Sequence, residues 1–131
     1  MQPSSARDFS VNLFYQLNEA VKLSHTVSDV PERDLVSEMI TTAKDWFEIA
    51  EEMQFIIKVE MALDGAAQDA VRPIILGRIA KLFADGKKAL DELTAQIETQ
   101  QNSRLISQAN ALLDEGRALV DTLAHEFGPF L

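Results

Sequence analysis

The sequence predicts an all-α fold, an antiparallel up-down-up-down four-helix bundle with long helices. Along four segments, apolar residues recur at alternating steps of three and four, which is the period of an amphipathic helix. Short stretches rich in Pro, Gly, Asn and Ser separate these segments. No segment alternates apolar and polar residues with β-branched enrichment, so we expect no strand. Short connections between long helices are typical of antiparallel neighbours.

We expect four helices in a single domain that covers residues 1–131, at about 5–29, 33–64, 69–100 and 103–127. Pro31 suits the first turn of the second helix, where a missing N–H is tolerated. Gly65 ends that helix, and Pro73 lies close to the first turn of the third. Asn102 or Ser103 caps the fourth.

The second segment carries two adjacent apolar seams, so this helix should contact at least two neighbours. The first seam is Leu35, Met39, Thr42, Trp46, Ile49, Met53, Ile56, Glu60 and Leu63. The second seam lies one residue on and comprises Val36, Ile40, Ala43, Phe47, Ala50, Gln54, Ile57 and Met61.

In the second half of this helix the remaining side is apolar as well, because it carries Phe55, Val59 and Ala62. A helix that is apolar all round must be covered on every side. The cover is either the following stretch "AAQDAVRP", the tail "FGPFL" or another subunit. Phe55, Val59 and Ala62 are therefore the candidate interface of a protein partner or a homodimer.

Two glycines interrupt the seams of the third and fourth helices. Gly86 and Gly116 lie fifteen residues before and after residue 101, the centre of the predicted turn, so they should face each other. Each costs about 1 kcal/mol of helix stability relative to alanine, which close packing must offset. Trp46 and Phe47 fall at about the same height. We interpret the glycines as room for an aromatic ring, most simply Trp46; the alternative is a slot for a small-molecule ligand.

Glu60 occupies a seam position between apolar residues, where a carboxylate needs a partner or a proton. Arg78 is the expected partner, since the turn near residue 67 brings it within about one helical turn. The alternative is that the seam ends early and leaves Glu60 in water. With Trp46, Phe47, Gly86 and Gly116, these two residues complete the candidate pocket.

Charge and residue types limit the function. The net charge is −9, from 21 acidic and 12 basic residues, and no basic patch suggests nucleic-acid binding. An acidic strip on the second helix, Glu38, Asp45, Glu48 and Glu52, is either a solvated face or a dock for a basic partner. The chain has no cysteine, and we find no metal motif, cofactor motif or membrane span.

We therefore expect a non-enzymatic helical bundle that acts through protein–protein contacts, as an adaptor, a chaperone or a regulatory subunit, and that self-associates in the cytoplasm. The alternative is a ligand-sensing bundle domain excised from a membrane receptor or sensor kinase, which would be periplasmic. An even number of helices brings both termini to one end, where two membrane spans could attach.

Overall fold

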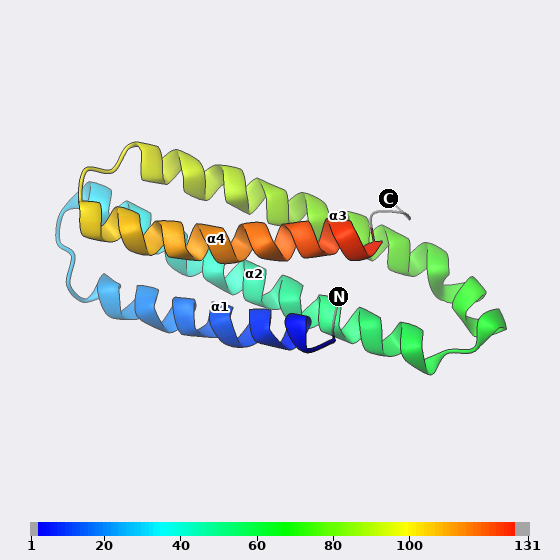
Figure 1. Cartoon of the computed structure of the whole chain (residues 1–131). Helices are drawn as coiled ribbons and strands as arrows, with labels where there is room; N and C mark the ends of the chain where they lie inside the picture. Colours follow the sequence, from blue (N-terminus) through cyan, green and yellow to red (C-terminus); the bar gives the residue numbers. More distant parts are fainter. Residues whose placement is uncertain (1–2, 128–131) are drawn as a thin grey trace.

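The computed structural model describes residues 3–127, which form four α-helices and no strand. The helices are α1 (Pro3–Ser24), α2 (Val30–Ala62), α3 (Gly65–Glu98) and α4 (Ser103–Phe127) (Figure 1). The prediction of an all-helical chain with four helices is confirmed. Within these residues no helix carries an apolar stretch of the length that a bilayer requires.

Successive helices lie side by side, and the chain reverses direction at each connection (Figure 1). α2 contacts all three other helices, while α4 contacts α1, α2 and α3. α1 packs most extensively against α2, and α3 packs against both α2 and α4. The buried core lies between the four helices, and its largest fully buried side chains include Trp46, Leu13, Met53 and Ile79.

Side-chain caps fix two of the helix starts. The Asn102 side-chain oxygen accepts hydrogen bonds from the backbone N–H groups of Arg104 at 3.0 Å and Leu105 at 3.3 Å, so the predicted cap of α4 is confirmed. The Asp64 carboxylate accepts from the Ala67 N–H at 3.2 Å and caps α3 in the same way. This cap makes the connection between α2 and α3 very short.

Both ends of α4 agree with the sequence prediction, the other boundaries differ by two residues or more, and two of them differ by at least four. α3 begins at Gly65 rather than at residue 69, and Pro73 lies inside the helix rather than in its first turn. The Asp64 cap starts the helix early, and Pro73 removes one N–H donor from the helical hydrogen bonds. α1 ends at Ser24 rather than at residue 29, because the backbone closes a tighter turn there: the N–H of Thr26 donates to the Leu23 carbonyl at 2.9 Å.

The far ends of α2 and α3 extend past the start of α1 and the end of α4 (Figure 1). Ile56 is the last buried residue of α2, and Ile75 is the first buried residue of α3. None of residues 57–74 is buried. We call residues 57–74 the α2–α3 tip.

Candidate functional site

Trp46 fills the space between the two seam glycines. Its indole N–H donates a hydrogen bond to the Gly86 carbonyl oxygen at 3.3 Å. At Gly116, an added Cβ would overlap three atoms of the six-membered part of the ring. At Gly86, an added Cβ would meet Val120 Cγ2 at 3.0 Å. The packing interpretation is confirmed for Gly116, whereas the close neighbour of Gly86 is Val120.

Phe47 does not join this group. Its ring lies 5.9 Å from the ring of Phe14 in α1, measured between centroids, with a tilt of 53°. Consecutive residues of a helix point about 100° apart around its axis, so Phe47 points away from Trp46. The candidate pocket therefore contains Trp46, Gly86 and Gly116 but not Phe47, and the indole occupies it.

The predicted pairing of Arg78 with Glu60 is wrong. Arg78 forms an ion pair with Glu52, and its Nε donates to Glu52 Oε1 at 2.7 Å. The early start of α3 shifts the register, so that Glu60 lies level with Gln68, whose side-chain amide donates to the Glu60 carbonyl oxygen at 2.9 Å. Glu60 lies in the tip, beyond the last buried residue of α2, where the seam ends early as in the alternative interpretation, but it is half-buried rather than fully exposed to water.

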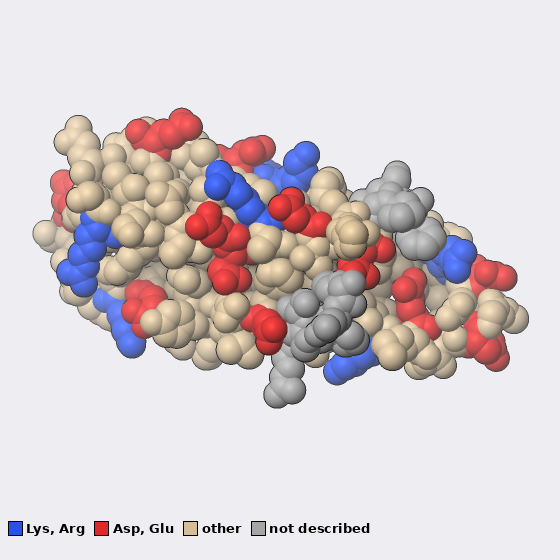
Figure 2. All heavy atoms as spheres, viewed as in Figure 1, with Lys and Arg blue, Asp and Glu red and all other residues tan. Residues whose placement is uncertain are grey.

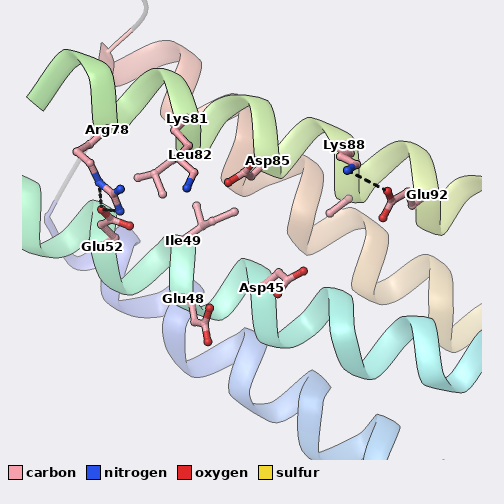
Figure 3. Close-up of a pocket in the computed structure, with 11 residues that line it drawn as sticks. Asp45, Glu48, Ile49, Glu52, Arg78, Lys81, Leu82, Asp85, Lys88 and Glu92 are labelled. Atoms are coloured by element: carbon pink, nitrogen blue, oxygen red, sulfur yellow. Dashed lines mark hydrogen bonds and ion pairs between the residues drawn. The ribbon is translucent and has the colours of Figure 1, made fainter.

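A charged groove of about 370 Å³ runs between α2 and α3 on the side away from α1 (Figure 3). Its apolar floor consists of Ile49, Leu82 and Ala89. Its walls carry five acidic and three basic side chains: Asp45, Glu48, Glu52, Asp85, Glu92, Arg78, Lys81 and Lys88. Three of the four residues of the predicted acidic strip thus form one wall.

Partial burial and nearby like charges perturb one carboxyl group in this groove. Partial burial raises the pKa of Asp45 above its usual value, and the nearby carboxylate of Glu48 raises it further. Asp85 and Glu92 act in the same direction, while Lys44 opposes them. The groove therefore favours a proton or a cationic group beside Asp45.

The basic wall of the groove is a feature that the sequence interpretation missed. Arg78, Lys81, Asp85, Lys88 and Glu92 follow one another at steps of three and four, so they share one face of α3. That spacing was a visible signal, although it does not show which face of α3 packs beside α2. Within residues 3–127, no three carboxylate or imidazole groups converge closely enough to hold a metal ion.

The most exposed large apolar side chains lie at or beside the tip. Met61 is 76% exposed, Ile74 69% and Phe55 65%, the three highest values among the described residues. Of the other candidate interface residues, Ala62 is exposed and Val59 is half-buried against the core. At this end of the molecule, uncharged surface lies between a few acidic and basic groups (Figure 2).

The stretch "AAQDAVRP" does not cover Phe55 as a loop, because residues 66–73 form part of α3. These residues are helical because the Asp64 cap starts α3 at Gly65. The tail "FGPFL" begins at Phe127, and its last four residues lie outside the described part of the chain. The comparisons of the chain with protein-family models, curated proteins and solved structures find no match.

Proposed function

We propose that the chain is a non-enzymatic protein-binding module, an adaptor, chaperone or regulatory subunit, and that the tip with Phe55 at its base is its binding surface. The observation that carries this proposal is that the three most exposed large apolar side chains lie at one end of the molecule, Phe55 and Ile74 on its outer side and Met61 on its inner side. Large apolar side chains exposed close to one another are typical of interaction sites.

The outer side of the helix pair supports the proposal. Glu52, Phe55, Val59 and Ala62 are spaced so that they share one face of α2, and Ile74 and Arg78 share one face of α3. Because Glu52 pairs with Arg78, Phe55 and Ile74 lie at neighbouring levels on the same side. Burial of each of these two side chains in a complex is worth about 1.5–3 kcal/mol before the costs of association.

In this proposal the helices form an antiparallel up-down-up-down bundle that holds the tip rigidly. The tip is also almost neutral, since residues 57–74 carry two basic and three acidic side chains. Of the net charge of −9, −8 therefore lies elsewhere. A partner that approaches the tip avoids most of that repulsion. Self-association is one of the contacts that we propose.

The test compares proteins captured by three forms of the full chain: wild type, Phe55→Glu and the matched control Val30→Glu. Val30 is 56% exposed and is the first residue of α2, at the opposite end of that helix. We expect quantitative mass spectrometry to show partners lost with Phe55→Glu and kept with Val30→Glu, at equal helix content by circular dichroism. Partners that bind all three forms equally would contradict the proposal.

The alternative function, a ligand-sensing receptor domain, has the charged groove as its only supporting feature among the described residues. Membrane spans that continued α1 and α4 would leave the bundle at the end from which the tip projects (Figure 1). The tip would then press against the membrane.

A further inference from the structure

The inner side of the tip continues a packing surface that α1 uses in the body of the molecule. The second seam of α2 faces α1, where Phe47 contacts Phe14. Ile57 and Met61 continue this seam at the same spacing, but α2 runs past the start of α1 there (Figure 1). Ile57 is half-buried, and Met61 is the most exposed large apolar residue of the described chain.

The tip is a preformed two-helix layer. The hydrogen bond from the Gln68 side chain to the Glu60 carbonyl at 2.9 Å joins α3 to α2. Between the two helices lies a hollow of about 130 Å³, lined by Glu60, Leu63, Gln68, Val71, Arg72 and Ile75. In cross-section this layer is half of a four-helix bundle, and neither α1 nor α4, as described, extends far enough to complete it (Figure 1).

We infer that a second copy of this chain supplies the missing half, with its own tip packed antiparallel on the inner side of the first. This inference rests on the proposed function and names the partner for one side of the surface. A two-fold symmetric contact needs a patch that is complementary to itself. A two-helix layer meets this condition, because two such layers stack into one four-helix section.

The two-fold symmetry determines which helices of the two copies pack together. For two stacked layers that run in opposite directions, the two-fold axis lies perpendicular to the helices, so α2 packs against α2 and α3 against α3. The axis passes near the middle of the tip, which brings Met61 opposite Met61 of the second copy. The same register sets Lys58 level with Asp64 of the second copy, and both side chains are exposed. These opposite charges favour the antiparallel register.

The size and charge of the contact predict a reversible dimer. Residues 57–62 of α2 extend by only about 9 Å, at roughly 1.5 Å per residue, so the interface belongs to the small class. The charge of −9 on each chain opposes association at low salt. We therefore expect the dimer to tighten as salt shortens the range of that repulsion.

The first test is sedimentation of the full chain over a range of protein and salt concentrations. We expect a concentration-dependent dimer that Met61→Glu weakens by roughly tenfold or more, as for a central interface residue. Ile74→Glu, on the outer side, and Val30→Glu, at the opposite end of α2, should leave the dimer unchanged. A dimer that Ile74→Glu dissociates and Met61→Glu does not would overturn the assignment of the inner side.

The second test uses the absence of cysteine from the chain, which gives every single-cysteine variant one thiol. Under mild oxidation, Met61→Cys should form a disulfide-linked dimer much faster than Ile74→Cys or Val30→Cys. Equal rates for the three variants would overturn the predicted axis. Dimers formed by a variant that ends at Phe127 but not by the full chain would also overturn the inference, because residues 128–131 would then be the occupant.

The two proposals fail separately. A chain that stays monomeric at all concentrations, yet loses its partners with Phe55→Glu, contradicts the second-copy inference and leaves the proposed function intact. A dimer with the predicted pairing in a chain that captures nothing through Phe55 contradicts the binding role of the outer side alone.

Discussion

The indole ring of Trp46, from α2, lies against the backbone of Gly116, from α4, in the core. The same ring reaches α3 through its hydrogen bond to the Gly86 carbonyl. One side chain thus joins three helices, and it does so only because α4 has no Cβ at this position. The glycine that weakens α4 locally is a condition for packing the largest buried side chain of the protein.

We expect Gly116→Ala to destabilise the protein. The new Cβ would overlap a rigid aromatic ring, and overpacking costs about 1–3 kcal/mol, while the gain in helix propensity is at most about 1 kcal/mol. The matched control is Gly77→Ala in α3, where a Cβ would meet nothing within 4 Å. Chemical denaturation should show a loss for Gly116→Ala and a gain for Gly77→Ala. An equal gain for both would contradict the packing of Trp46.

The ion pair between Glu52 and Arg78 should contribute little to stability, because both side chains are partly exposed, at 30% and 51%. A double-mutant cycle with Glu52→Gln and Arg78→Gln should give a coupling energy of about 0.2–1 kcal/mol. The parallel cycle with Glu60→Gln and Arg78→Gln should give a coupling energy near zero. A measurable coupling between Glu60 and Arg78, with none between Glu52 and Arg78, would support the pairing that the sequence alone suggested.

The charged groove should make stability depend on pH through Asp45. Burial raises the pKa of this carboxyl group above its usual 3.8, so the folded state binds the proton more tightly than the unfolded state. The stabilisation from this group is complete below pH 3.8 and is lost as the pH rises through the higher folded-state pKa. At neutral pH the ionised group therefore costs stability.

Asp45→Asn should consequently raise the free energy of unfolding at pH 7, and the difference from wild type should shrink as the pH falls toward 4. Asp91→Asn, at an exposed position of α3, reports the general effect of removing one negative charge. Denaturation at several pH values measures both. A difference for Asp45→Asn that is the same at every pH would contradict the raised pKa.

Most of the fold could be predicted from the sequence, because its signals are local and repeat along each helix. The apolar period located all four helices, and Trp46 was expected near the two seam glycines, where it lies. The apolar residues around Phe55 also indicated that the second half of α2 is apolar on every side, and not only on the side that faces the core. In the structure the last part of this half, residues 57–62, belongs to the tip.

The wrong pairing of Arg78 came from one connection. The sequence gives no direct measure of where the chain turns between α2 and α3, and the Asp64 cap places the turn a few residues earlier than residue 67. In an antiparallel pair, a shift of the turn moves the facing residue by twice as much. Arg78 therefore meets Glu52 rather than Glu60. The same shift put Pro73 inside a helix, where its sequence position gave no warning.

The groove could be predicted only in part. The acidic strip of α2 was visible as a spacing, but whether it faces water or a neighbouring helix depends on the rotation of α3 about its own axis. The long side chains of Arg78, Lys81 and Lys88 tolerate either arrangement, so the sequence did not decide between them.

The central claim is that partners bind at the tip, and site-specific photocrosslinking tests it most directly. A photoreactive residue would replace Ile74 in one variant and Val30 in another, two exposed aliphatic side chains at 69% and 56%. In extracts of the native host we expect discrete crosslinked protein bands from position 74 and none above background from position 30. Crosslinks from position 30 alone, or equal crosslinks from both positions, would contradict the claim.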